Sequence, residues 1–273
     1  MMLNIHFPCF IDYSTIITIK VKFMSTKIIQ ITDLHLNKSK DMVSNGVNTL
    51  ESARMVIESI RINEKNVDCL ILSGDLSNDY SIESYNHLMQ LLKDLMAPIY
   101  LMSGNHDSPS LLKTLSNNKN IFFKNFESFN NWGAFMFNTK KEGSPNGLLK
   151  SEELVCFDKV LSNTLYKNII IFLHHHPVPI GSASMDSMII ENAALLTDRI
   201  MKHNKIKAVS WGHIHNEFNL DMGSAKLFST PSTCYQAKEK SKDFIIDPDA
   251  SPGYRKIFLN DDGSFDTEVI RVF

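Results

Sequence analysis

Five short polar motifs hold most of the histidine in this 273-residue chain. In chain order they are Asp33-Leu34-His35, Gly74-Asp75, Gly104-Asn105-His106-Asp107, His174-His175-His176-Pro177 and Gly212-His213-Ile214-His215. They contain seven of the ten histidines. Carboxylates and imidazoles together suit borderline divalent ions such as Mn, Fe and Zn, and the thiolates typical of structural zinc sites are missing from the motifs. The motifs therefore predict a metal site.

Each motif alone has an ordinary structural explanation. A lone Asp-x-His has roughly one chance in ten of binding metal, and Gly-Asp after a strand is more often a turn. The GNHD motif suits a capped turn, and HHHP suits a polar strand end. The GHIH motif is more specific, because two histidines on one face after a glycine need a partner. Five such motifs in series, each after a predicted strand, favour metal binding over these separate explanations.

The motifs follow five segments that are typical of buried strands. These segments are short and apolar, and they span 27–32, 68–73, 99–103, 169–173 and 208–211. Helical patterns alternate with them at about 47–64, 81–96, 109–117, 151–165 and 187–203, and the chain after Lys226 looks more β-like. This order predicts an α/β fold, with one domain as the simplest organisation. Because the carboxyl ends of parallel strands share one edge, we expect the motifs to meet there.

Composition excludes several classes of protein. The 28 Lys and Arg nearly cancel the 30 Asp and Glu, which argues against nucleic-acid binding. No run approaches the ~18 apolar residues of a membrane span. The four cysteines Cys9, Cys69, Cys156 and Cys234 lie far apart without CxxC pairing, which suits a reducing cytoplasm. Residues 1–23 lack signal-peptide features, and Met24 begins a plausible second start, so we expect a mis-called start or a dispensable extension.

The ordered motifs resemble those of the calcineurin-like metallophosphoesterase superfamily over residues 27–220. The stretches HHHPVPIGSASMD, WGHIHNEF, TPSTCYQ (Thr230–Gln236) and SPGYR (Ser251–Arg255) are more narrowly similar to bacterial class III cyclic-AMP phosphodiesterases. The resemblance implies a metallophosphoesterase domain over residues 24–273, built as a four-layer α/β/β/α sandwich of two stacked sheets flanked by helices. It also implies two divalent ions, with Fe or Mn favoured over Zn.

The resemblance implies a role for each motif residue. In this assignment the first ion is bound by Asp33, His35, Asp75 and His215. The second ion is bound by Asp75, which bridges the two ions, and by Asn105, His175 and His213. If the HHHP segment is extended, His174 and His176 face away from His175, and they either pack in the core or support the ligands from behind. His106 faces the substrate, with Asp79 as a candidate to orient it. The implied substrate-binding residues are His35, Asp75, Asn105, His106 and His215.

The implied reaction is hydrolysis of 3′,5′-cyclic AMP to 5′-AMP. A hydroxide held between the two ions attacks phosphorus, Asn105 helps to neutralise the phosphoryl oxygens, and His106 protonates the leaving 3′ oxygen. The substrate is thus a small nucleotide, with no nucleic-acid or membrane partner, and a homodimer stays open.

Other functions stay open at this point. The main alternative is a metallophosphoesterase for another phosphodiester or monoester, such as a 2′,3′-cyclic nucleotide, a glycerophosphodiester or a nucleotide. A non-catalytic interaction module is disfavoured because all seven ligand positions are filled. Thr233, Cys234 and Gln236 could contact adenine, support a dimer or form a turn and strand edge.

Overall fold

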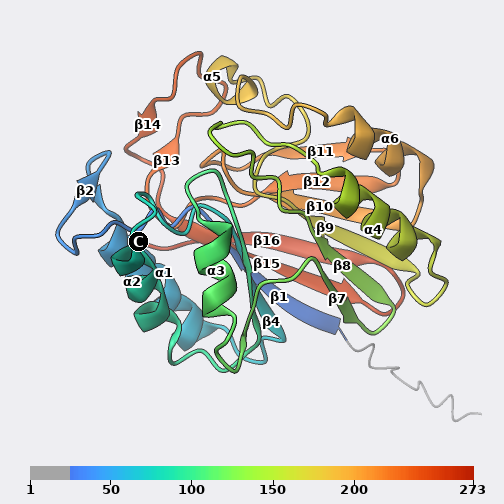
Figure 1. The fold of residues 1–273 in the computed structure, drawn as a ribbon, viewed down its shortest axis with the longest axis horizontal. Helices are drawn as coiled ribbons and strands as arrows, with labels where there is room; N and C mark the ends of the chain where they lie inside the picture. Colours follow the sequence, from blue (N-terminus) through green and yellow to red (C-terminus); the bar gives the residue numbers. More distant parts are fainter. Residues whose placement is uncertain (1–24) are drawn as a thin grey trace, which may run out of the picture.

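The computed structural model describes residues 25–273, so the expectation about residues 1–23 lies outside the described residues. Two six-stranded sheets stack face to face, with helices on both outer sides (Figure 1). The first sheet runs β16 (Phe265–Arg271), β15 (Gly253–Asn260), β1 (Ser25–Ile31), β4 (Cys69–Ser73), β5 (Ile99–Met102), β6 (Ile121–Phe122). The second runs β11 (Asn219–Met222), β12 (Ala225–Ser229), β10 (Ile206–Trp211), β9 (Asn168–Phe172), β8 (Trp132–Met136), β7 (Phe126–Phe129).

Both sheets are mixed, with antiparallel strands on one side of the first sheet and at both edges of the second. The strands β1, β4, β5 and β6 run parallel, and β15 and β16 extend that sheet in antiparallel fashion. In the second sheet β7 and β11 are the antiparallel edges. Two short hairpins lie outside the sheets, β2 (Val43–Ser44) with β3 (Val47–Asn48), and β13 (Gln236–Ala237) with β14 (Ile246–Asp247).

Three helices cover the first sheet, namely α1 (Thr49–Asn63), α2 (Ile82–Leu92) and α3 (Pro109–Leu115). The second sheet is covered by α4 (Ser151–Ser162), α5 (Ala183–Asp186) and α6 (Ala194–Lys202). Helix α3 begins where the sequence predicts, because the Ser108 side chain accepts the Leu111 N–H and Pro109 occupies the first turn. Among the helices of residues 25–273, none has the length and apolar character needed to cross a membrane.

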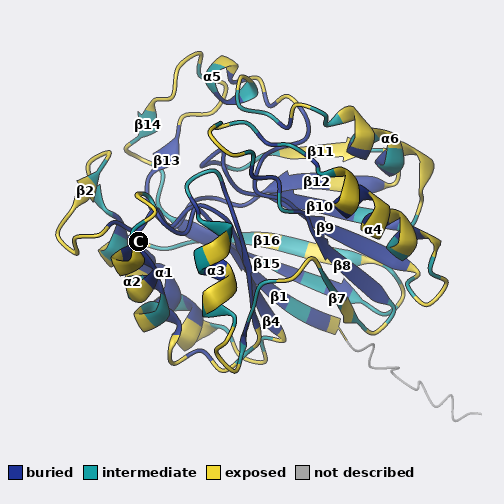
Figure 2. Ribbon diagram, in the orientation of Figure 1, coloured by how far each residue is buried: buried dark blue, intermediate teal, exposed yellow. Residues whose placement is uncertain are grey.

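Strand residues alternate between the two interfaces of the first sheet. Ile28 of β1 and Ile71 of β4 pack between the sheets against Ile170 and Phe172 of β9. The side chain of Ile29 points to the opposite face of β1 and packs under the helices. Both faces of the central strands are therefore buried, as the dark central strands of Figure 2 show. The four-layer α/β/β/α sandwich is confirmed.

The five motif strands do not belong to one sheet. Strands β1, β4 and β5 lie in the first sheet, and β9 and β10 lie in the second. The sequence analysis missed β7 and β8, the first two strands of the second sheet along the chain. In β8, Gly133 is a poor strand former, but a Cβ there would lie 2.9 Å from Ile169 Cδ1, so close packing on β9 requires it. The helix predicted over 187–203 is shorter, with α6 starting at Ala194.

Candidate metal centre

The loops after the five motif strands meet at one end of the sandwich. Main-chain hydrogen bonds join them within each sheet: Asp33 N–H donates to Gly74 O at 2.9 Å, and Gly212 N–H donates to His174 O at 3.2 Å. The two halves of the site, carried by different sheets, are tied together by the His213 N–H, which donates to Asp33 Oδ2 at 2.9 Å. The sequence expectation that the motifs converge is met, although across a sandwich instead of along one sheet edge.

Five of the predicted ligands have a left-handed backbone. Their φ angles are positive, at 54° for Asp33, 44° for His35, 50° for Asp75, 66° for His213 and 51° for His215. Such conformations cost on the order of 1–3 kcal/mol each in non-glycine residues and cluster at functional sites. The Asp33–His35 and His213–His215 pairs therefore converge through left-handed loop backbone.

Asp33, His35 and His215 form one compact, buried group. His35 Nε2 lies 3.1 Å from His215 Nε2, and Asp33 Oδ1 lies 3.4 Å from His215 Nε2. Asp75 adds its Oδ2 at 3.6 Å from His35 Nε2. His215 Nδ1 is 2.9 Å from the main-chain oxygen of Tyr235, a contact that directs Nε2 into the group, as is usual for metal-binding histidines.

The other oxygen of Asp75 faces a second group. Asp75 Oδ1 lies 3.4 Å from His174 Nε2, which is 3.2 Å from Asn105 Oδ1. His174 Nδ1 is held 2.9 Å from Ser73 O, so that Nε2 points at Asp75 and Asn105. His213 lies beside His174, and its Nε2 is buried without a hydrogen-bond partner among residues 25–273. Asp75 thus stands between two ligand groups, as a bridging carboxylate requires.

The neighbouring histidines differ from their expected placement. His175 also lies near His174 and His213, but its Nδ1 is 2.7 Å from Thr139 Oγ1 and its Nε2 is 3.1 Å from Pro145 O. The chain bends at His174 and His175 immediately after β9, so the alternation of an extended segment does not apply. As a result His174, expected either to pack or to support the ligands from behind, contacts Asp75 and Asn105 directly. His176 packs away from them, 3.6 Å from Asp186.

Electrostatics prepare these groups for cations. Burial raises the pKa of Asp75, but the charge and hydrogen bond of His174 outweigh it and hold that pKa well below its usual value. Burial lowers the pKa of His35 to about 4 and that of His213 well below its ordinary value, so both imidazoles are neutral and have free lone pairs. A cation beside His213 would also satisfy its unpartnered Nε2. The donor set therefore fits divalent ions of the Mn, Fe and Zn type.

Two glycines permit the close approach of the loops. A Cβ on Gly104 would lie 2.1 Å from Asp75 Oδ1, and one on Gly212 would lie 2.0 Å from Thr32 Oγ1 and 2.6 Å from Asp33 Oδ2. Any side chain at either position would displace a predicted ligand. The GNHD and GHIH motifs therefore need glycine at these positions, because a side chain would not fit.

His106 lies at the edge of the site. Its main-chain N–H donates to Asp75 Oδ1 at 2.8 Å, and its ring centroid lies 5.1 Å from that of His35. Its Nδ1 is 3.2 Å from Asn78 O, so a main-chain carbonyl orients the ring. Asp79, the carboxylate named as a candidate for this role, instead accepts hydrogen bonds from Lys38 and Ser81.

Sequence reasoning overlooked the role of Asp107, the last residue of the GNHD motif. Its buried carboxylate accepts main-chain N–H groups from Leu76, Ser77 and Gly104 at 2.9–3.1 Å. These bonds fix the Gly74-Asp75 loop against the Gly104-Asn105 loop. The signal was present in the motif, since an aspartate in a turn between buried elements is suited to accept main-chain donors.

The stretch TPSTCYQ supports the site from behind. Thr233 N–H donates to Thr32 O at 3.1 Å, and Cys234 Sγ lies 3.2 Å from Asp33 O. Gln236 Nε2 donates to Ser232 O at 2.9 Å within the stretch itself. All three side chains are buried, and Thr233 and Cys234 hold the backbone around Asp33.

Two aromatic residues that the sequence analysis did not single out flank His215. The Tyr235 ring stacks on the His215 ring, with centroids 4.8 Å apart. Phe244 lies edge-on to His215 at 5.8 Å and is 38% exposed. This side of the site therefore presents an accessible aromatic ring directly beside a predicted ligand.

Comparisons with known proteins agree with this geometry. The pattern of the calcineurin-like phosphoesterase family matches residues 26–217. The 3′,5′-cyclic adenosine monophosphate phosphodiesterase CpdA of Escherichia coli K12 is 34% identical over 247 residues, 90% of each chain. CpdA of Pseudomonas aeruginosa is 31% identical over 248 residues, 91% of this chain and 90% of its own. A dimetal phosphatase from Danio rerio has the same fold, with a TM-score of 0.62 at 14% identity, covering 91% of this chain and 99% of its own. The chain therefore belongs to the calcineurin-like phosphoesterase family.

Proposed function

We propose that this protein hydrolyses 3′,5′-cyclic AMP to 5′-AMP with two divalent ions that share Asp75. The broader class does not depend on this proposal, because family and relatives together make the chain a metal-dependent phosphodiesterase. The observation that carries the finer proposal is that relatives described as cyclic-AMP phosphodiesterases match about 90% of the chain at 31% and 34% identity.

The ligand assignment is part of the proposal. The first ion takes Asp33, His35, Asp75 and His215, the buried group whose ring nitrogens and carboxylates face one another. The second takes Asp75, Asn105, His213 and a histidine of the HHHP motif. His174 is favoured over His175 there, because its Nε2 already faces Asp75 and Asn105. Burial lowers the pKa of His174, but the charge of Asp75 outweighs it and raises that pKa to about 9, so the ion would take the place of the proton on Nε2. Mn or Fe are favoured over Zn, with availability deciding among ions that one such site accepts.

The ions would supply an acidified water as nucleophile and positive charge for the phosphoryl oxygens. The chain's own residues then account for orientation and proton transfer. With Oδ1 directed at the second ligand group, the Asn105 side-chain nitrogen is free to donate to a phosphoryl oxygen. His106, held through Nδ1 by Asn78 O, presents its Nε2 side to the substrate and protonates the departing 3′ oxygen.

The position of Phe244 favours a nucleotide substrate over a glycerophosphodiester substrate. Its accessible ring offers an apolar, flat surface beside His215, one of the proposed ligands of the first ion. A purine can stack on such a ring, and base–aromatic stacking is worth about 1–3 kcal/mol. A glycerol moiety gains no comparable contact.

The cytoplasm is the proposed location. The three described cysteines, Cys69, Cys156 and Cys234, are all free, which supports a reducing compartment.

Product analysis with cyclic AMP as the only substrate tests the proposal. The metal-free protein is reconstituted with Mn²⁺ or Fe²⁺, and we expect 5′-AMP as the product and no turnover after chelation. Cyclic GMP, 2′,3′-cyclic AMP, glycerophosphodiesters and bis(p-nitrophenyl) phosphate form the comparison panel. Turnover of bis(p-nitrophenyl) phosphate without turnover of cyclic AMP would show a metal-dependent diesterase with another natural substrate.

A further inference from the structure

Lys140 is a nearly buried cation beside the proposed metal centre. It follows β8 in the second sheet, and its side chain is only 5% exposed. Within residues 25–273 its one carboxylate neighbour within 4.0 Å is Glu142, whose own side chain is 81% exposed. The ammonium instead donates a hydrogen bond of 2.9 Å to the main-chain oxygen of Asn105. Burying a charge is costly without such a partner, so the contact calls for an explanation.

The same main-chain oxygen receives a second donor. The Tyr80 hydroxyl donates to Asn105 O at 2.6 Å, and Lys140 Nζ lies 4.9 Å from the centroid of the Tyr80 ring. Tyr80 follows the Gly74-Asp75 motif, and Lys140 comes from the other sheet. Two donors from two loops therefore converge on one carbonyl, and a cation–π contact holds the donors together.

The peptide that carries this carbonyl leads directly into the metal centre. On its other side, the His106 N–H donates to Asp75 Oδ1 at 2.8 Å. The side chain of Asn105 places Oδ1 3.2 Å from His174 Nε2. Fixing the carbonyl of Asn105 therefore fixes the orientation of its side chain toward the second ligand group.

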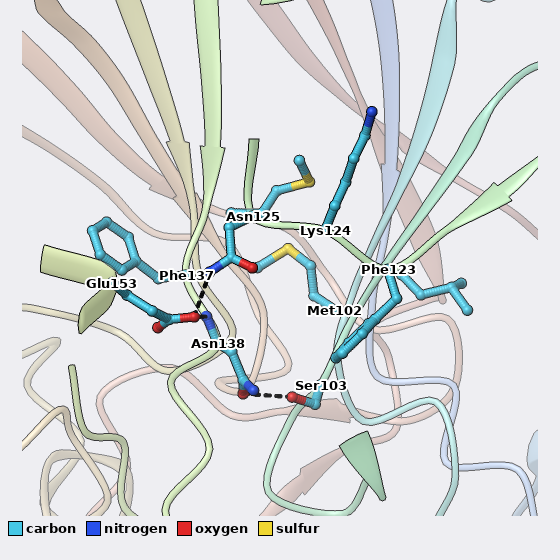
Figure 3. Close-up of a pocket in the computed structure, with 10 residues that line it drawn as sticks. Met102, Ser103, Phe123, Lys124, Asn125, Phe137, Asn138 and Glu153 are labelled. Carbon is cyan, nitrogen blue, oxygen red and sulfur yellow. Dashed lines mark hydrogen bonds between the residues drawn. The ribbon is translucent and has the colours of Figure 1, made fainter. Parts of the chain in front are cut away.

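Asn138 supports the arrangement from behind. Its Oδ1 accepts hydrogen bonds from Ser103 Oγ at 2.6 Å and from the Lys140 N–H at 3.2 Å. Figure 3 shows the Ser103–Asn138 bond at a small cavity of about 50 Å³ between the loops. The backbones that carry Lys140 and the GNHD motif are thus held by one amide group.

We propose that Lys140 is a positioning residue, which together with Tyr80 fixes Asn105 as a ligand of the second ion. The proposal rests on the two-ion site of the proposed function. Groups that hold a ligand in place typically contribute 10- to 100-fold in metal affinity or activity. The contribution of Lys140 is confined to the second ion, because its contact is with Asn105 and not with the group of Asp33, His35 and His215.

The test is stepwise Mn²⁺ binding to the metal-free protein by calorimetry, with kcat and KM as a second measurement. Lys140→Met keeps the apolar stem and removes the donor. We expect the second Mn²⁺ to bind about 10-fold more weakly and the first within 2-fold, with a fall in kcat of about 10-fold and little change in KM. Lys141→Met is the matched control, because Lys141 pairs with Glu191 at 2.6 Å on the surface.

Tyr80→Phe removes the second donor from a half-exposed residue and tests the same idea where Lys140→Met does not fold. Tyr80→Phe should weaken the binding of the second Mn²⁺ by a few-fold. In the double variant the affinity for this ion should fall by less than the product of the two single effects, because both donors share one acceptor. Unchanged binding of the second ion, or equal weakening of both ions, would overturn the role of Lys140. Wild-type protein that takes up only one ion would instead overturn the two-ion proposal.

Discussion

The Nε2 atom of His174 lies 3.4 Å from Oδ1 of Asp75, and this contact joins side chains carried by different sheets. It makes the metal centre a property of the assembled sandwich, because neither sheet holds both ligand groups. His174 approaches Asp75 from the loop after β9, while Asp75 follows β4. Binding of an ion between them would therefore stabilise the packing of the two sheets on each other.

His174 and His175 can be distinguished by substitution. We expect His174→Asn to lose the second ion and more than 100-fold in kcat, because its Nε2 faces Asp75 and Asn105. His175→Asn should keep both ions and lose stability, since both ring nitrogens of His175 contact the protein atoms Thr139 Oγ1 and Pro145 O. The metal content of each variant, measured by mass spectrometry, and its thermal melting curve show which of the two histidines is the ligand. The reverse pattern would restore His175, the ligand that the sequence analysis favours.

His106 should affect chemistry and not metal binding. His106→Ala is expected to keep both ions and lose about 100-fold or more in kcat on cyclic AMP, since general acid catalysis contributes about 10²–10⁴-fold. The loss should be much smaller on bis(p-nitrophenyl) phosphate, because p-nitrophenolate leaves without a proton. Equal losses on the two substrates would argue against proton donation, and loss of an ion would assign His106 to the metal.

Much of this architecture is visible in the sequence because burial and chain order determine it. Apolar runs such as 69–73, which are buried on both faces and followed by Gly-Asp, can hardly be anything but central strands. The sequence analysis did not predict strand β8, because Gly133 lowers its apparent strand propensity. Only the packing of Gly133 on Ile169 reveals why a glycine is needed there. A local sequence pattern cannot reveal a contact with a residue 36 positions farther along the chain.

The site could be located but not fully assigned from sequence. The choice between His174 and His175 depends on a bend after Leu173, and nothing in three identical residues signals where the chain turns. The positive φ of Asp33 and Asp75 is equally hidden, since glycine is the residue that usually marks that conformation. The contact of Phe244 with His215 is formed by tertiary structure alone.

Phe244 provides a test of nucleobase recognition. Phe244→Ala should raise KM for cyclic AMP about 10-fold, as expected for the loss of ~1–2 kcal/mol of stacking, and leave kcat nearly unchanged. Phe244→Trp should retain the low KM. Ile245→Ala changes the exposed neighbouring side chain and serves as the control. Steady-state kinetics give the answer, and a KM that is the same in Phe244→Ala and Ile245→Ala would place the base elsewhere.

Glu64 links stability to pH away from the site. Its side chain, 6% exposed, lies 2.6 Å from Lys27 Nζ and accepts the Tyr254 hydroxyl at 2.7 Å. Burial raises the pKa of Glu64, but these hydrogen bonds outweigh it and hold the pKa below its usual value. A carboxylate with a depressed pKa stabilises the fold above the unfolded pKa of about 4.3, and this stabilisation is lost as the pH falls through the lower, folded value.

Glu64→Gln should therefore cost about 2 kcal/mol at pH 7, or a fall in Tm of roughly 5 °C. The difference from wild type should shrink steadily below pH 4.5, because Glu64 takes up a proton in the unfolded wild-type chain before it does so in the folded protein. Glu58→Gln is the control, since Glu58 lies in helix α1, which ends just before Glu64, and pairs with Arg61 on the surface, where ion pairs contribute little. Melting curves of the three proteins from pH 7 to pH 3.5 measure the effect. A Glu64→Gln deficit that stays constant over this range would mean that packing of the side chain, and not its charge, carries the stabilisation.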